Sequence, residues 1–172
     1  QTCNRWSCCP SGGVMQGAEL KSGDKAPAFD LLDQDGKRHS LADYAGKKIL
    51  LYFYPKASTP GCTTQACSLR DAFADLKALN VVVLGVSPDQ PDALKKFAEN
   101  QSLNFVLLSD PEKKVAGSYG VTENKAVFGL ISLGITRSSF LIDESGQIIN
   151  VWYKVKPDQT APLAIECLKN HK

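Results

Sequence analysis

The sequence has little net charge of either sign and no long apolar run. Its 20 lysine and arginine residues against 18 aspartate and glutamate residues give a formal net charge of +2. A nucleic-acid-binding surface normally carries a strong basic excess, which this chain lacks. The longest uncharged apolar stretch, Ala126 to Ile135, is about half of the roughly 20 residues that a membrane-spanning helix requires. We therefore expect neither nucleic acid nor a membrane as a partner.

Motifs for metals and nucleotides are also missing. The chain has two histidines and no Cys-x2-Cys pair, so the common zinc patterns are absent. It contains neither a Gly-x-Gly-x-x-Gly sequence nor a Walker loop. We therefore expect no metal and no cofactor. The length of 172 residues predicts one domain over residues 20–172, preceded by a flexible tail over residues 1–19.

Cysteine is the residue type that stands out. Six cysteines fall into three groups: Cys3, Cys8 and Cys9, then Cys62 and Cys67, and finally Cys167. Six cysteines permit fifteen disulfide connectivities, so their number alone assigns no bond. We interpret the first group as part of an incidental tail, with a metal or redox role as the alternative, and Cys167 as a passive structural residue.

The apolar pattern predicts alternating strands and helices. Strands are expected over residues 28–33, 38–41, 49–54, 81–86, 105–108, 136–143 and 147–153, and helices over 62–79, 91–100, 112–119 and 157–169. Asp35-Gly36 predicts a β-hairpin between the first two strands. This order indicates an α/β fold with a central mixed sheet and helices on both of its faces.

The chemistry is expected at Cys62. This residue follows a buried strand and a loop rich in proline and glycine, and it opens a helix. A helix N-terminus carries unpaired N–H groups and about half a positive charge, which stabilises the thiolate form of a cysteine. Ligands of α/β sheets also bind beyond the carboxyl ends of strands. Cys62 is therefore a candidate nucleophile.

Cys67 lies five residues further along the same predicted helix. On a straight helix the two Cα atoms are roughly 8.7 Å apart, whereas a disulfide requires about 4.4–6.8 Å. A Cys62–Cys67 disulfide could form only if the helix unwinds. We therefore expect a helical reduced form and a locally unfolded oxidised form. The alternative is that both residues are buried and act as small hydrophobic side chains.

A family resemblance narrows these possibilities. The pattern Pro55-x-x-x-Thr59-x-x-Cys62 resembles the active-site signature of the peroxiredoxins. The surrounding run from Tyr52 to Asp71, together with Gly23 to Phe29 and Thr136 to Asp143, is similar to the bacterioferritin comigratory protein or peroxiredoxin Q subfamily, of the atypical two-cysteine type. The similarity extends from about Leu20 to the C-terminus.

The resemblance implies a thioredoxin-like fold and thiol-dependent reduction of hydrogen peroxide and organic hydroperoxides. By position, Cys62 matches the peroxidatic cysteine, which forms a sulfenic acid, and Cys67 matches the resolving cysteine of an intramolecular disulfide. Thioredoxin or a similar dithiol is the implied reductant. The resemblance also suggests a monomer in a bacterial cytoplasm, or in a plastid if a transit peptide has been removed.

Other residues receive roles from the same match. The hydroxyl of Thr59 and the loop backbone up to Gly61 would bind the peroxide oxygens. Arg137 would stabilise the thiolate and the leaving oxygen, and Pro55 would shield the thiolate from water. One departure affects this scheme, because Gln65 stands where the family usually has glutamate.

Several of these residues also have an interpretation without a catalytic role. Thr59 could be an ordinary turn residue, Arg137 an ordinary surface arginine and Cys67 inert. The stretch over residues 126–135 is expected to be a loop packed beside the active site, with a weak dimer contact or a wall for the hydroperoxide as the alternative.

A redox sensor or redox-switched binding protein is the second functional hypothesis. A general disulfide oxidoreductase is a third, but the chain lacks its Cys-x-x-Cys motif.

Overall fold

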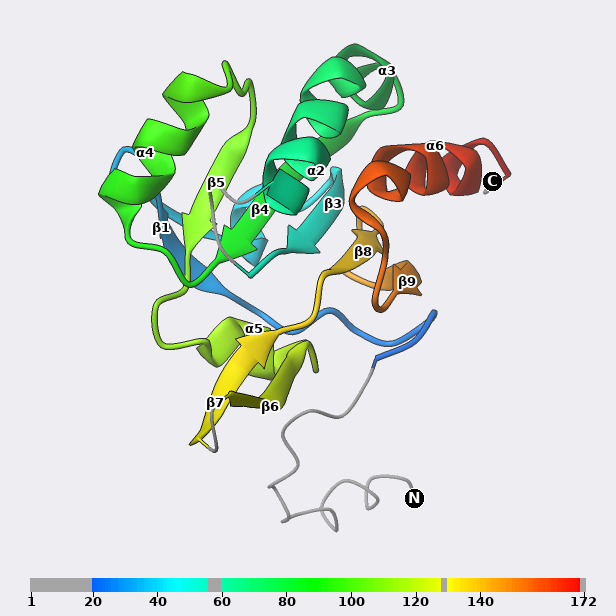
Figure 1. Cartoon of the computed structure of the whole chain (residues 1–172). Coiled ribbons are helices and arrows are strands. Elements are labelled where there is room, and N and C mark those ends of the chain that lie inside the picture. Colours follow the sequence, from blue (N-terminus) through cyan, green and yellow to red (C-terminus); the bar gives the residue numbers. More distant parts are fainter. Residues whose placement is uncertain (1–19, 56–59, 128–129, 171–172) are drawn as a thin grey trace, which may run out of the picture.

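The computed structural model describes residues 20–55, 60–127 and 130–170 (Figure 1). The predicted tail over residues 1–19, with its three cysteines, lies outside the described residues, and so does Thr59. No helix in the described part of the chain is long and apolar enough to cross a membrane.

Seven strands of the described chain form one mixed sheet, in the order β2-β1-β5-β4-β3-β8-β9. Strands β3, β4 and β5 run parallel, while β1, β8 and β9 pair antiparallel to their neighbours. The bounds are β1 Asp30–Asp33, β2 Arg38–Ser40, β3 Lys48–Phe53, β4 Val81–Ser87, β5 Val106–Ser109, β8 Ser138–Ile142 and β9 Ile148–Trp152. The predicted hairpin is confirmed, with Gly36 at a φ of 82° in its turn.

Helices cover both faces of this sheet, as predicted. One face carries α2 Pro60–Asp71, α3 Phe73–Ala78, α4 Pro91–Asn100 and α6 Thr160–Asn170 (Figure 1). The other face carries the short helix α5 Lys114–Ser118. Two short 3-10 helices, η2 Leu41–Tyr44 and η3 Pro157–Gln159, complete the described helices.

The central strand β3 explains the two-layer core. Leu50 and Tyr52 point toward α2, α4 and α6, whereas Ile49, Leu51 and Phe53 point toward α5. All five are at most 1% exposed. A strand buried on both faces requires a continuous apolar run, which is the pattern that the sequence shows here.

The predicted helix over residues 62–79 is two helices. Helix α2 begins two residues earlier, at Pro60, where a proline is favourable because the first helical N–H needs no partner within the helix. The chain leaves helical geometry at Ala72 and resumes it at Phe73. The Leu76 N–H still donates to the Ala72 carbonyl at 3.0 Å. The apolar spacing therefore continues across the break, and periodicity could not reveal it.

The predicted loop over residues 126–135 is wrong. Residues 126–127 and 130–135 belong to an antiparallel pair, β6 Thr122–Val127 and β7 Leu130–Ile135, which forms a separate two-stranded sheet near α5 (Figure 1). An apolar run with two glycines shows no alternation, and its partner strand carries the polar residues 123–125, so neither strand has a clear period. The side chains of residues 123–133 lie outside the described ones.

Candidate active site

The candidate site lies where β3 leads into α2. The strand ends at Phe53, the half-buried Pro55 follows, and α2 begins at Pro60. This junction is at the carboxyl ends of the parallel strands β3 and β4 (Figure 1). The predicted location of the site is therefore the crevice that α/β folds use for ligands.

Cys62 is the third residue of α2 and a free cysteine that is only 1% exposed. The guanidinium of Arg137 donates from Nη1 to its Sγ at 3.4 Å. Arg137 directly precedes β8, and the register of β8 on β3 pairs Ser138 with Phe53. The antiparallel pairing therefore delivers Arg137 to the strand end where Cys62 begins its helix. The two residues were predicted to act together, and the structure brings them into contact.

Gln65 holds the arginine in place. Its side chain is fully buried, and its Oε1 accepts from Arg137 Nη1 at 2.9 Å. Its Nε2 donates to Thr160 Oγ1, at the start of α6, at 2.7 Å. Both ends of the amide are thus satisfied by one cation and one hydroxyl. Because the amide is neutral, it orients the guanidinium without neutralising its charge.

The contacts that run from Cys62 through Arg137 and Gln65 end at Thr160, a residue that the sequence analysis did not identify. It is 1% exposed and lies 95 positions from Gln65. Its position at a helix start is a common one for threonine, so it carries no sequence signal of a link to the site. The glutamine was noticed only as a departure from the family pattern.

Gly61 permits the arginine to approach. A Cβ atom built at this glycine would lie 2.9 Å from Arg137 Nη2 and 3.6 Å from Pro157 Cγ. A side chain there would therefore press on the guanidinium that contacts Cys62. Gly61 was predicted to act through its backbone, and its lack of a side chain is a second contribution.

Cys67 lies on another side of α2 and is half-buried with a free thiol. Its Sγ donates to Oε1 of Gln101, at the end of α4, at 3.4 Å. The helix runs without interruption from Cys62 to Cys67. The prediction that the reduced pair lies on an intact helix is confirmed. Cys167 lies apart on α6, half-buried, with Asn150 Nδ2 3.8 Å from its sulfur.

Two tyrosines form the floor under α2. The rings of Tyr52 and Tyr54 are stacked with centroids 5.4 Å apart, and both side chains are 1% exposed. Burial raises the pKa of both phenols well above the ordinary value of 10, and neighbouring groups such as Cys62 add to the rise. The floor of the site therefore stays uncharged and adds no negative charge beside Cys62.

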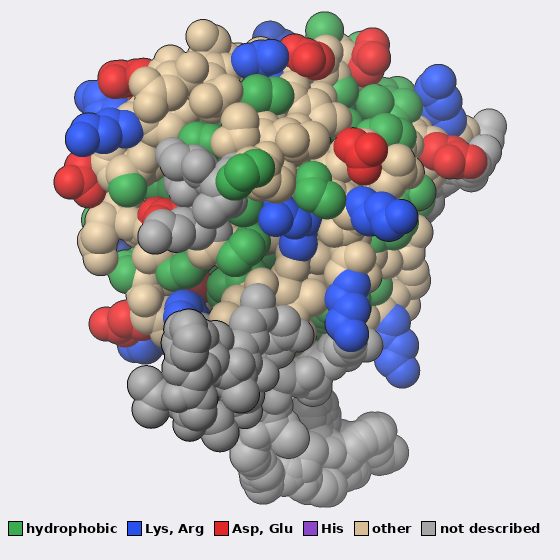
Figure 2. Space-filling view, viewed as in Figure 1, with side chains coloured by type: hydrophobic (Ala, Val, Ile, Leu, Met, Phe, Trp, Pro, Cys, Tyr) green, Lys and Arg blue, Asp and Glu red, His purple; other side chains and the backbone are tan. Residues whose placement is uncertain are grey.

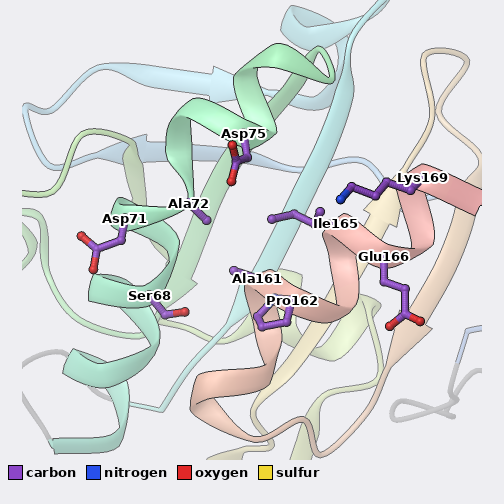
Figure 3. Close-up of a pocket in the computed structure, with 9 residues that line it drawn as sticks. All are labelled: Ser68, Asp71, Ala72, Asp75, Ala161, Pro162, Ile165, Glu166 and Lys169. Carbon is purple, nitrogen blue, oxygen red and sulfur yellow. The ribbon is translucent and has the colours of Figure 1, made fainter.

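A groove of about 540 Å³ runs along the flank of α2 that faces α6 (Figure 3). Apolar side chains such as Ala72 and Ile165 line it, together with the charged residues Asp71, Asp75, Glu166 and Lys169. None of its lining residues is a cysteine. In the described residues no group of three or more His, Cys, Asp or Glu could hold a metal ion.

Comparison with known proteins gives the family. A family model described as AhpC/TSA matches residues 22–151, most of the chain. The chain belongs to the AhpC/TSA family. It is also 48% identical to peroxiredoxin Bcp of Escherichia coli strain K12 over 152 residues, which cover 88% of this chain and 97% of that protein.

Solved structures of this peroxiredoxin's relatives have the same fold. A mutant of PrxQ from Xylella fastidiosa has a TM-score of 0.83 and 30% identity, covering 90% of this chain and 98% of that one. The bacterioferritin comigratory protein of Xanthomonas campestris, which has alkyl peroxide reduction activity, has a TM-score of 0.79 and 33% identity, covering 83% and 91%.

These likenesses confirm the predicted thioredoxin-like fold and the resemblance to the bacterioferritin comigratory protein subfamily. The chain is a peroxiredoxin, a thiol-dependent peroxidase.

Proposed function

We propose that this peroxiredoxin reduces hydrogen peroxide and organic hydroperoxides with Cys62 as the peroxidatic cysteine. The observation that carries the proposal is the contact between the buried Cys62 sulfur and Arg137 Nη1, at 3.4 Å, in the first turn of α2. A cation and a helix N-terminus acting on one sulfur favour the thiolate, which is the nucleophilic form.

In the first step the Cys62 thiolate attacks one peroxide oxygen. A sulfur–oxygen bond forms, the oxygen–oxygen bond breaks, and the departing hydroxide or alkoxide takes a proton and leaves as water or an alcohol. Cys62 becomes a sulfenic acid. Arg137 stabilises the charge that develops on the departing oxygen, and the N–H groups at the start of α2 act in the same direction.

Three further roles belong to this step. The backbone at Gly61 contributes N–H groups, and Pro55, half-buried at the end of β3, limits the access of water to the thiolate. Thr59, which lies outside the described residues, supplies a hydroxyl to the peroxide. These roles rest on the family resemblance and on the position of each residue within the seven positions that precede Cys62 in the sequence.

In the second step Cys67 resolves the sulfenic acid. Its thiolate attacks the Cys62 sulfur, a disulfide forms, and the hydroxyl of the sulfenic acid leaves as water. On the intact helix the two Cα atoms are roughly 8.7 Å apart, beyond the about 7 Å that a disulfide tolerates. The first turns of α2 must therefore unwind before the bond forms.

Thioredoxin or a similar dithiol then reduces the disulfide. We propose a monomer in a reducing compartment, with the bacterial cytoplasm as the first candidate and a plastid as the second. On the face seen in Figure 2, lysine and arginine side chains are interspersed with aspartate and glutamate. A small uncharged substrate requires no steering field, only the positive charge beside one thiolate.

Two cysteine variants test the proposal. Cys62→Ser should abolish peroxide consumption, because the nucleophile is lost. Cys67→Ser should still form a sulfenic acid, detected with a dimedone-type reagent, but should not turn over with thioredoxin. Cys167→Ser is the matched control and should keep full turnover. Peroxide consumption by Cys62→Ser at the parent rate would refute the role of Cys62, and unchanged thioredoxin turnover by Cys67→Ser would refute that of Cys67.

A redox-switched binding protein or sensor is the second candidate. The observation that favours it is that one helix carries both cysteines and must unwind when they join. Slow peroxide consumption together with partner binding that depends on the Cys62–Cys67 disulfide would support this candidate over the peroxidase. Insulin reduction at a rate comparable to thioredoxin would instead support a general disulfide oxidoreductase.

A further inference from the structure

Gln101 receives two hydrogen bonds from α2. Its side-chain Oε1 accepts from the thiol of Cys67 at 3.4 Å, and its backbone carbonyl accepts from Nη1 of Arg70 at 2.6 Å. The two donors lie three positions apart on α2, so they face the same side of that helix. One residue outside α2 therefore holds the turn that contains Cys67.

The end of α4 makes Gln101 a firm anchor. Gln101 follows the last residue of α4, and its own N–H donates to the Phe97 carbonyl at 3.1 Å. Ser102 then adopts a left-handed φ of 52°. The Leu103 N–H donates to the Ala98 carbonyl at 2.9 Å, and this hydrogen bond ends α4. The guanidinium of Arg70 lies at the negative end of α4, where a cation is favourable.

We propose that Gln101 is a latch that holds Cys67 on folded α2, so that its side chain sets the rate at which the disulfide forms. This inference rests on the proposed role of Cys67. The Cys67 thiol must leave Gln101 before its sulfur reaches Cys62, because the intact helix α2 holds the two cysteines too far apart for a bond. Gln101 does not touch the peroxide or Cys62, so it is a positioning residue.

The latch controls a competition at the sulfenic acid. In one outcome the Cys67 sulfur attacks the Cys62 sulfur, the S–S bond forms, the S–O bond breaks, and water leaves. In the other a second peroxide oxidises the sulfenate to a sulfinic acid and is itself reduced to water or an alcohol. Holding Cys67 longer favours the second outcome. Gln101 thereby sets how much peroxide the enzyme withstands before it is inactivated.

Gln101→Met tests the latch, because methionine has a similar length and shape but lacks the carbonyl oxygen. One equivalent of hydrogen peroxide is mixed rapidly with reduced protein, samples are quenched with acid, and mass spectrometry follows sulfenic acid and disulfide over time. We expect disulfide formation to be about fivefold faster, as for the loss of one neutral hydrogen bond. Oxidation of Cys62 should stay within about twofold of the parent. The peroxide concentration that gives half sulfinic acid should rise in parallel.

Two controls separate a latch from a general weakening of α4. Lys96→Gly, at an exposed position of the same helix, lowers helix propensity without a contact to α2. It should lower the thermal midpoint and leave the disulfide rate unchanged. Gln101→Glu keeps an oxygen acceptor, so its disulfide should form no faster than the parent's.

An unchanged disulfide rate in Gln101→Met would overturn the proposal, and so would an equal acceleration in Lys96→Gly. Both results are distinguishable from failure of the proposed function. If Cys67 is not the resolving residue, peptide mapping of the oxidised parent shows no Cys62–Cys67 disulfide, whatever residue occupies position 101.

Discussion

The first and second halves of α2 hold their cysteines in opposite ways. Cys62 is 1% exposed and contacts a guanidinium that is itself fixed by a fully buried amide. Cys67 is half-buried and contacts the neutral side chain of a residue at the end of another helix. The same residue type on one helix is therefore placed for two tasks. The Cys62 sulfur contacts a cation at the start of the helix, and the Cys67 sulfur contacts a neutral acceptor further along it.

The folded helix separates the two proposed steps, which are the oxidation of Cys62 and the formation of the disulfide with Cys67. While α2 is folded, Cys62 has its cation and Cys67 has its acceptor. Unwinding of the first turns would break the contact between Cys62 and Arg137, because Gln65, which fixes Arg137, lies on the same helix. In the proposed mechanism, oxidation of Cys62 uses the folded helix, and formation of the disulfide requires the helix to unwind. The predictions below change one half of α2 at a time.

Removal of the cation should have the largest effect, and only on the first half. In Arg137→Met the Cys62 sulfur loses the contact at 3.4 Å. We expect the second-order rate of Cys62 oxidation to fall about 100-fold, as for the loss of one oxyanion donor. Stopped-flow measurement with hydrogen peroxide checks this. Disulfide formation after oxidation should change by less than about threefold. An equal loss in both steps would contradict the separation of the two halves.

Loss of the buried amide should have a smaller effect on the same half. Gln65→Leu removes the bonds to Arg137 and to Thr160, so the guanidinium is no longer oriented. We expect Cys62 oxidation to slow about tenfold and the free energy of unfolding to fall by about 1–3 kcal/mol, because buried polar groups lose their partners. Urea unfolding and stopped-flow kinetics measure the two effects.

Gln65→Glu is the matched control for that prediction, because its carboxylate still accepts from Arg137 and can accept from the Thr160 hydroxyl. Its stability should stay within about 1 kcal/mol of the parent. If Gln65→Leu oxidises as fast as the parent, the amide does not position the arginine.

A change remote from both cysteines should affect neither half. Burial raises the pKa of Asp33, but hydrogen bonds from His39 and from the backbone of Lys37 and Asp35 outweigh it, so its pKa lies below the ordinary 3.8. A lowered pKa in the folded state stabilises the fold above pH about 4, and this stability is lost as the pH falls through the folded value.

Urea unfolding between pH 3 and 6 tests this contribution. The stability of the parent should fall toward pH 3, and Asp33→Asn should show a flatter dependence. Asp30→Asn is the control, since the Asp30–Arg38 pair is 60% and 63% exposed and should contribute little. Peroxide consumption by all three at pH 7 should agree within about twofold. A large change in rate would mean that the hairpin is coupled to α2.

The sequence predicted the elements whose pattern is local. The apolar run of β3 and the Asp35-Gly36 turn each carry their own signal, and α4 was predicted with its observed bounds. The break between α2 and α3 and the β6–β7 pair were misjudged because their signal is not local. The break at Ala72 keeps the apolar spacing, and β7 is recognisable as a strand only through its pairing with β6.

The residues of the site also divide into those with a local sequence signal and those without one. Cys62 could be singled out from its place after a buried strand, because helix start and nucleophile coincide in a few neighbouring residues. Thr160 and Gln101 could not, since they lie 95 and 34 positions from the α2 residues that they contact. A hydroxyl at a helix start and an amide at a helix end are common in proteins. Their contacts with α2 follow only from the packing of α2 against α6 and α4.

One measurement tests the central claim most directly. The reduced protein is treated with one equivalent of hydrogen peroxide, and hydrogen exchange over residues 60–71 is followed together with peptide mapping of the disulfide. The account predicts a Cys62–Cys67 disulfide and a loss of amide protection in α2, with protection restored by a dithiol. A disulfide that involves Cys167 or a second chain, or an α2 that stays protected after oxidation, would contradict it.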